Sequence, residues 1–192
     1  METTWSDALV TTQGDREAAV LRSREGMIIE RRQHKVDAPA QSAYAAFTRL
    51  GGETGWLYAN GLWRLRGALD RMVGGVGLRR GRRDAADVRV GDALDFWRVE
   101  AVEPGRMLRL RAEMKVPGRA WLQFEALPDG EREAKLAQTA FFAPRGLLGL
   151  LYWYGLYPIH TAIFSGMIRR LAVLSERTAA AGSVKSRAGT HE

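Results

Sequence analysis

The stretch GLLGLLYWYGLYPIHTAIFSGMI, which runs from Gly146 to Ile168, decides how this chain folds. It contains no Asp, Glu, Lys or Arg, and arginines flank it at Arg145, Arg169 and Arg170. An uncharged run of this length with aromatic residues and basic flanks is typical of a membrane-spanning helix. The same run could instead form a helix that covers the apolar side of a sheet.

The spacing of apolar and polar residues separates these two interpretations. A helix turns by about 100° per residue. After Pro158, one face of such a helix carries Ile163, Phe164, Met167, Leu171 and Leu174. The opposite face carries Thr161, Ser165, Arg169, Ala172 and Glu176. A helix in lipid has no use for a polar stripe that continues into charged residues, so the pattern favours an amphipathic helix and no membrane span. Pro158 either kinks this helix or stands in its first turn.

Four runs of strand length precede this helix. They are DALDFWRVEAV (92–102), RMLRLRAEM (106–114), RAWLQFEAL (119–127) and AKLAQTAFFA (134–143). Pro and Gly between the runs predict hairpin turns and therefore antiparallel neighbours. Leu108 and Leu110 alternate with Arg109 and Arg111, so the predicted sheet has one apolar face for the helix to cover.

The residues before these strands predict one more strand and two helices. The strand is MIIERRQHKV (27–36). The helices lie in APAQSAYAAFTRL (38–50) and in ANGLWRLRGALDRMVGG (59–75), where Leu62, Leu65, Leu69, Met72 and Val73 form an apolar stripe. We expect residues 1–25 to be loosely ordered, residues 26–177 to form a single domain, and residues 178–192 to be a disordered tail.

Composition excludes several classes of function. The chain has 192 residues, a net charge of +7 and no cysteine, so disulfides, thiolate catalysis and cysteine zinc sites are excluded. Arg79, Arg80, Arg82, Arg83 and Arg89 form a basic cluster without a groove-reading motif, so we expect no nucleic-acid partner. The alternative is that this cluster binds a phosphate-bearing ligand or an acidic surface. Three histidines and no metal-binding motif predict no metal and no cofactor, and the missing secretory signal favours the cytoplasm.

The chain resembles a domain family of the START-like (SRPBCC) superfamily over roughly residues 26–174. The stretches that carry the resemblance are LWRLRGALDRMVGGVGLRRGRR (62–83), VGDALDFWRVE (90–100), LRLRAEMKVPGRAWLQFE (108–125) and QTAFFAPRGLLGLLYWYGLYPIHTAIFSGM (138–167). The order of elements and the resemblance both indicate an α+β helix-grip fold, in which a curved antiparallel sheet wraps around a long C-terminal helix. The resemblance further implies a hydrophobic cavity between sheet and helix.

In that family the domain often follows an NAD(P)-binding, NmrA-like domain. This chain has no Rossmann half, and GGVGLRRG (74–81) lacks the strand-then-helix context of a dinucleotide-binding loop. An NAD(P)-dependent reductase would therefore have to be a separate partner.

His160 is the first candidate for a functional residue. It lies at the centre of the apolar helix face beside Phe164 and Met167, and Trp153 and Leu156 join that face if the helix continues upstream. A buried imidazole without a hydrogen-bond partner costs about 1–3 kcal/mol. His160 is therefore either a core histidine paired with a strand residue, or a group that reaches into the cavity and polarises or deprotonates a ligand.

Further polar candidates lie on the strands. Gln138 interrupts an apolar face, where it could pair with His160 or orient a ligand. Asp95, Trp97 and Arg98 follow one another closely, and alternation leaves open which of them points inward. Asp95 or Arg98 could contact a ligand, but a charge inside the cavity would need a partner.

These residues support two classes of function. The first is a binding module for a small hydrophobic molecule that is lipid-like, aromatic or polyketide-like. The second is a cyclase, dehydratase or isomerase that uses His160 as general acid or base. An accessory role beside a reductase is a third alternative.

Overall fold

The structure of this chain is a computed structural model that describes residues 9–12, 17–51, 55–58, 60–72, 74–77 and 87–188. Its helices are α1 (Ala40–Thr48), α2 (Asn60–Met72) and α3 (Gly146–Ala188). Its strands are β1 (Leu9–Thr12), β2 (Glu17–Arg24), β3 (Met27–Val36), β4 (Ala93–Leu94), β5 (Trp97–Glu103), β6 (Met107–Ala112), β7 (Gly118–Pro128) and β8 (Ala134–Pro144). Arg79–Arg83, four arginines of the basic cluster among them, lie outside the described residues.

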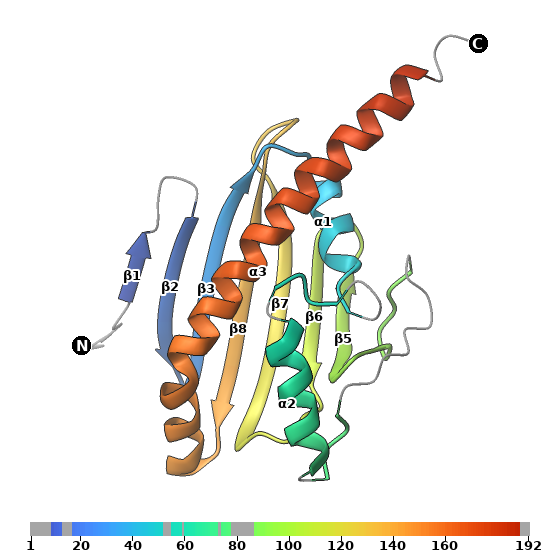
Figure 1. The fold of residues 1–192 in the computed structure, drawn as a ribbon. Helices are drawn as coiled ribbons and strands as arrows, with labels where there is room; N and C mark the ends of the chain where they lie inside the picture. Colours follow the sequence, from blue (N-terminus) through green and yellow to red (C-terminus); the bar gives the residue numbers. More distant parts are fainter. Residues whose placement is uncertain are drawn as a thin grey trace.

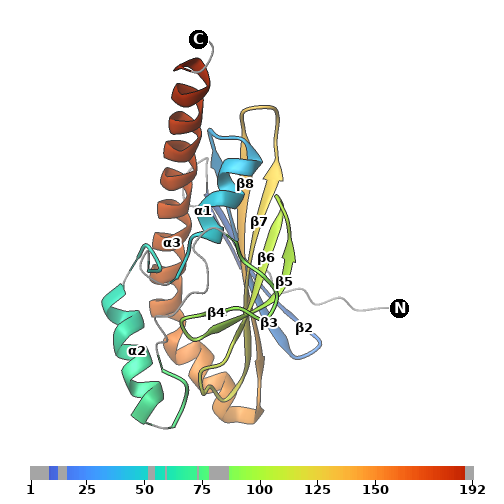
Figure 2. The same cartoon turned by 90° about the vertical axis from the view of Figure 1, so that its right-hand side faces the viewer.

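The strands form one antiparallel sheet in the order β1-β2-β3-β8-β7-β6-β5-β4. The long helix α3 crosses this sheet diagonally (Figure 1). All three helices lie on the same side of the sheet, so its other side has no helix against it (Figure 2). This confirms the predicted α+β helix-grip architecture, with α1 and α2 inserted between β3 and the later strands.

One predicted strand is a hairpin in the structure. Residues 92–102 form β4 and β5, joined by a two-residue turn at Asp95 and Phe96. Asp95 has a φ of 56°, in the left-handed region that tight hairpin turns require and that Asp tolerates better than most residues. Because the chain reverses at this turn, Leu94 pairs with Trp97 and shares a face with it, whereas one continuous strand would place these two residues on opposite faces.

Regular secondary structure extends toward both ends of the described chain. Residues 1–25 contain β1 and β2, and β2 pairs with β3 from Glu17 to Arg24. The open edge of β3 supplies backbone hydrogen bonds, so this pairing does not require an alternating sequence. At the other end, α3 continues as far as Ala188. Adding residues to an existing helix carries no nucleation cost, and alanines 179–181 are good helix formers.

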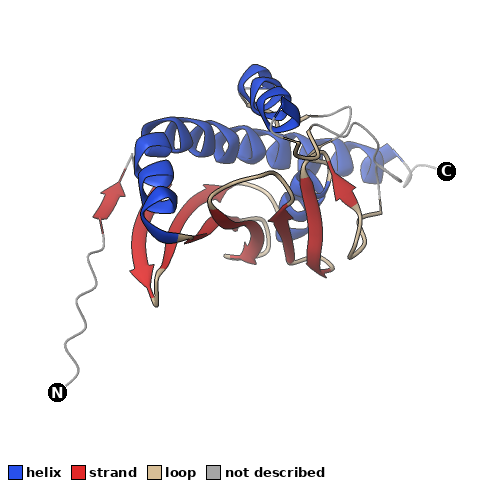
Figure 3. Cartoon of the chain, turned by 90° about the horizontal axis from the view of Figure 1, so that it is seen from below, coloured by secondary structure: helices blue, strands red, loops and turns tan. Residues whose placement is uncertain are grey.

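Helix α3 passes through Pro158 without interruption and is 43 residues long. Its first turns bend away from the axis of the remainder (Figures 2 and 3). A proline inside a helix removes one backbone hydrogen bond and commonly causes such a bend. Among the described helices, none has a stretch apolar and long enough to cross a membrane.

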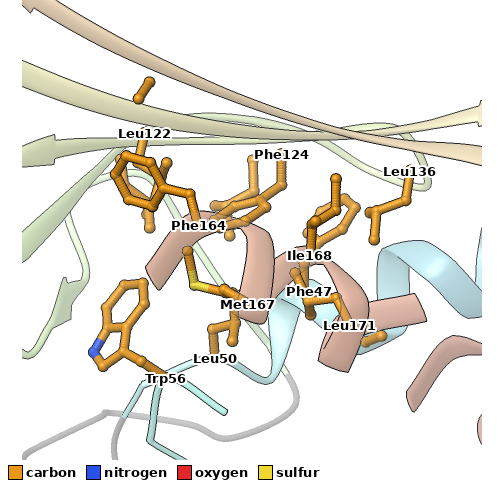
Figure 4. Close-up of a cluster of buried hydrophobic side chains, with 14 of the residues drawn as sticks. Phe47, Leu50, Trp56, Leu122, Phe124, Leu136, Phe164, Met167, Ile168 and Leu171 are labelled. Atoms are coloured by element: carbon orange, nitrogen blue, oxygen red, sulfur yellow. The ribbon is translucent and has the colours of Figure 1, made fainter. Parts of the chain in front are cut away.

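The hydrophobic core lies between α3, α1 and the sheet. Met167, Ile168 and Leu171 of α3 are fully buried beside Phe47 and Phe124 (Figure 4). Burying each such side chain stabilises the fold by about 1.5–3 kcal/mol. The core therefore holds the middle of α3 rigidly on the sheet.

The helix face expected to be polar is also partly buried. Ser165 and Ala172 are both buried, and Ser165 Oγ accepts a hydrogen bond of 2.7 Å from Arg32 Nη1 on β3. Arg32 in turn forms an ion pair with Glu30 of the same strand. The buried charge of Arg32 needs polar partners, and Ser165 supplies one of them. Part of the polar stripe therefore faces this ion pair and not solvent.

Candidate ligand-binding site

A pocket of about 300 Å³ lies between α2, the first half of α3 and the apolar face of the sheet. The helices line it with Trp63, Leu65, Arg66 and Leu69 of α2, and with Tyr152, Trp153, Leu156, Ile159, His160, Ile163 and Phe164 of α3. The sheet and its loops contribute Trp97, Met114, Val116, Ala120, Trp121, Leu122, Ala140, Phe141 and Phe142. A mostly apolar, aromatic-rich lining with few polar groups is typical of small-molecule sites.

Aromatic rings form a continuous wall from the sheet onto α3. Phe142 of β8 stacks on Trp153 with centroids 5.3 Å apart and an interplanar angle of 14°. Trp153 contacts His160 at 5.4 Å, and His160 stacks on Phe164 at 5.7 Å and 19°. Because these residues fall one turn or more apart along α3, a single helix face supplies three of the four rings.

One ring nitrogen of His160 lacks a hydrogen bond. Its Nδ1 atom is buried and has no partner among the described residues, and neither has the side-chain amide of Gln138, so the alternative in which these two residues pair is not formed. Burial, and secondarily the positive charge of Arg66, lowers the pKa of His160 to about 4. The imidazole is therefore neutral near pH 7 and carries a polar atom at the pocket that remains without a partner.

Three tryptophans of the pocket share this property. The indole Nε1 atoms of Trp63, Trp97 and Trp153 are buried and donate to no acceptor in the described part of the chain. Two other tryptophans use their indole donors: Trp56 Nε1 donates to Asp95 Oδ2 at 2.7 Å, and Trp121 Nε1, at the pocket's edge, donates to Glu100 Oε1 at 3.2 Å. Buried donors normally have partners, so their concentration around one pocket is a property of the site.

Arg66 is a pocket residue that sequence reasoning missed. Its Nη2 donates to the backbone carbonyl oxygen of Lys115 at 2.8 Å, and its Nη1 lies 3.8 Å from Asp70 Oδ1. Asp70 is buried and accepts hydrogen bonds from the backbone N–H groups of Lys115 and Gly77, at 2.7 and 3.0 Å. The available signal was the Arg66–Asp70 pair, four residues apart on the helix that also carries Trp63.

The structure brings five of the predicted site residues together in the pocket. They are Trp97, Trp153, Leu156, His160 and Phe164. Met167 is fully buried in the core and does not line this pocket. Trp153 and Leu156 were expected on the His160 face only if the helix continues upstream of Pro158. It does, because α3 begins at Gly146, and both residues line the pocket.

Three polar candidates lie elsewhere. Gln138 is buried on the apolar face of β8, with both amide atoms lacking a partner among the described residues, but it does not line the pocket. Asp95 lies in the β4–β5 turn, where it binds Trp56. Arg98 lies on the outer side of the sheet and forms a bidentate pair with Glu113 at 2.9 and 3.0 Å. The hairpin turn sends Trp97 inward and Arg98 outward, which removes Arg98 from the cavity.

The apolar stripe of α2 is only partly buried. Leu65 and Leu69 are 57% and 48% exposed and border the pocket, and Met72 is 82% exposed. The buried side of α2 instead carries Trp63 and Asp70. The backbone N–H groups that Asp70 binds offset the cost of burying its charge, which allows α2 to pack with its leucines at the pocket rim.

The family model for the protein family of unknown function DUF2867 matches residues 25–167, which include α2, most of the sheet and the pocket part of α3. The chain belongs to the DUF2867 family. No curated protein matches the sequence.

Solved structures with a related chain arrangement share little sequence with this DUF2867 protein. Truncated norcoclaurine synthase from Thalictrum flavum is 10% identical, with a TM-score of 0.48 over 77% of this chain and 92% of the other. The Zhui aromatase/cyclase from Streptomyces sp. R1128 is 13% identical, with a TM-score of 0.46 over 79% and 94%. The conserved protein EF2215 from Enterococcus faecalis is 11% identical, with a TM-score of 0.47 over 82% and 77%. Similarities at this level carry no function over to the DUF2867 protein.

Proposed function

We propose that this DUF2867 protein binds a small hydrophobic molecule in the pocket between α2, α3 and the sheet. The observation that carries the proposal is the 300 Å³ pocket itself, whose lining is almost entirely apolar and aromatic. Concave pockets with apolar and aromatic linings are the usual sites of small hydrophobic molecules. A bound apolar molecule would remove both its own apolar surface and that of the lining from water.

The ring wall favours an aromatic or polyketide-like molecule over a purely aliphatic one. The wall is a row of four rings in contact, which belong to Phe142, Trp153, His160 and Phe164. Aromatic pairs add about 0.5–1.5 kcal/mol beyond the area they bury. A flat ligand gains this increment, whereas a flexible aliphatic chain loses conformational entropy on binding.

Native mass spectrometry of freshly purified protein tests the proposal directly, since a retained molecule can be extracted and identified. Titration with the neutral fluorophore N-phenyl-1-naphthylamine provides a second measurement. We expect saturable binding that Ala120→Phe weakens at least tenfold, because the larger ring occupies the pocket. Ala68→Phe on the exposed side of α2 is the control and should bind normally. Equal binding by both variants would refute the pocket as the site.

A second candidate function is catalysis on such a molecule, with His160 as general acid or base. The supporting observation is a neutral imidazole that lines the pocket and whose Nδ1 has no partner among the residues that the structure describes. If a cyclase, dehydratase or isomerase activity is found, His160→Gln should reduce kcat by about 10²–10⁴-fold. An activity that survives this substitution unchanged would exclude His160 from the reaction.

Two expectations about cellular context stay predictions. They are residence in the cytoplasm and association with a separate NAD(P)-dependent reductase. Co-purification of such a reductase with the tagged protein at a fixed stoichiometry would support the association.

A further inference from the structure

We propose that the pocket selects molecules that carry an anionic group, and that Arg66 of α2 binds this group while the apolar body lies against the ring wall. This inference rests on the proposed function and adds the chemical class of the ligand to it. The inference has three requirements. Arg66 must have unused hydrogen-bond donors, and its charge must act on the pocket. The other polar groups that line the pocket must be able to donate to an acceptor on the ligand.

Arg66 retains donor capacity in its present position. A guanidinium has five N–H donors, and within the described residues Arg66 uses one of them, on the carbonyl oxygen of Lys115. Asp70 lies 3.8 Å away and already accepts two backbone N–H bonds. The carboxylate therefore anchors α2 to the neighbouring loops and balances the charge of Arg66 only at a distance.

The charge of Arg66 acts on the pocket. Among the described residues that line the cavity, Arg66 alone carries a full charge at neutral pH. Its field contributes to keeping the His160 imidazole neutral, so it is felt on the α3 side of the cavity. The Arg66 side chain is 24% exposed, so it loses less hydration on pairing with an anion than a fully buried arginine would lose.

Other polar atoms of pocket residues are hydrogen-bond donors that an acceptor on the ligand would satisfy. The indole donors of Trp63, Trp97 and Trp153 have no acceptor within the described part of the protein. Trp63 precedes Arg66 by three residues and lies on the same side of α2. A ligand with carboxylate, sulfonate, phenolate or enolate oxygens could accept from these groups, whereas a donor-rich amine would meet the positive charge of Arg66.

Two fluorophores with one skeleton test the inference. The compound 8-anilino-1-naphthalenesulfonate differs from N-phenyl-1-naphthylamine by a sulfonate. We expect the sulfonate to bind the unmodified protein about tenfold more tightly than the neutral compound, as a charge-assisted contact predicts. Arg66→Gln should abolish this preference, so that the ratio of the two affinities falls to about one. Arg66→Lys should retain part of the preference.

Arg64→Gln is the matched control, because Arg64 is exposed on the same helix and does not line the pocket. It should leave the ratio of the two affinities unchanged. Equal affinities in the unmodified protein, or a ratio that Arg66→Gln does not alter, would overturn the inference while binding of the neutral compound still supports the proposed function. If neither compound binds, or if Ala120→Phe weakens the binding of neither, both proposals are overturned.

Discussion

His160 shows how a single residue reports on the pocket. On the sequence it is a polar residue at the centre of an apolar helix face. In the structure it lies between Trp153 and Phe164, and its Nδ1 atom has no partner among the described residues. Burial without a hydrogen bond disfavours the charged form, so the folded protein holds the imidazole neutral.

The low pKa of His160 predicts a specific loss of stability in mild acid. The pKa is about 4 in the folded protein and 6.5 ordinarily, so between these values the unfolded chain binds the proton and the folded chain does not. The free energy of unfolding therefore falls as the pH is lowered from about 6.5 to about 4, by about 3 kcal/mol in total. Urea unfolding across this range should show the loss in the unmodified protein.

The control for this measurement is His160→Gln, which cannot take up the proton. Its unfolding free energy should lack the His160 contribution, so the difference between the two proteins should shrink or reverse toward pH 4. Parallel pH profiles would show that His160 titrates normally in the folded state and that the fold does not disfavour its charged form.

At the scale of the element, helix α3 contains two glycines that the same substitution should affect oppositely. A Cβ at Gly149 would lie 2.5 Å from the Pro117 carbonyl oxygen and 2.8 Å from Pro144 Cα, both backbone atoms that cannot easily move. A Cβ at Gly155 would meet nothing within 4 Å. Gly149 thus permits close approach of α3 to the end of β8, whereas Gly155 has no contact that requires it.

We expect Gly149→Ala to lower the free energy of unfolding by about 1–3 kcal/mol through overpacking. Gly155→Ala should raise it by about 0.5–1 kcal/mol, because alanine favours the helix. Chemical denaturation of both variants gives the two values. The same sign for both would mean that close contact at Gly149 does not limit the position of α3.

The contact between α3 and β3 depends on a buried ion pair. Arg32 pairs with Glu30 and donates to Ser165 of α3, and all three residues are buried. Burial raises the pKa of Glu30, although Arg32 acts in the opposite direction. The pair therefore stabilises the docking of α3 only while both members are present.

Removing one member tests this arrangement. Arg32→Leu should lower the free energy of unfolding by about 3–5 kcal/mol, since it leaves the Glu30 carboxylate buried and unpaired. The double variant Glu30→Gln/Arg32→Leu should recover a substantial part of this loss. Thermal unfolding of both variants measures the difference, and a double variant no more stable than Arg32→Leu would show that the charge of Glu30 is not the cause.

At the scale of the whole molecule, the pocket couples ligand binding to stability. It is formed jointly by α2, α3 and the sheet, so a molecule bound there has no site in the unfolded chain. At a free concentration one hundred times its Kd, such a molecule should stabilise the protein by about 2.7 kcal/mol. Calorimetry with N-phenyl-1-naphthylamine should show a corresponding rise in Tm that is absent from Ala120→Phe. An equal rise in that variant would place the binding outside the pocket.

The regular parts of this architecture were predictable because their patterns are local. Strands β3, β6, β7 and β8 each coincide closely with an alternating or apolar run, and the phase of residues after Pro158 identified the buried face of α3. The errors fall where a distant partner decides the outcome. Strand β2 depends on the open edge of β3, and the exposure of Leu65 and Leu69 depends on how Asp70 is satisfied.

The sequence by itself determined the α+β class, the antiparallel order of the later strands and the helical, non-spanning character of the Gly146–Ile168 stretch. Only the tertiary structure decided which side chains meet at the pocket. It turned Arg98 outward through a two-residue turn, left Gln138 away from the cavity, and brought Arg66 and His160 to the same pocket. The physical reason is that periodicity depends on neighbours along the chain, whereas the site depends on how α2, α3 and the sheet, which lie far apart in the sequence, surround one pocket.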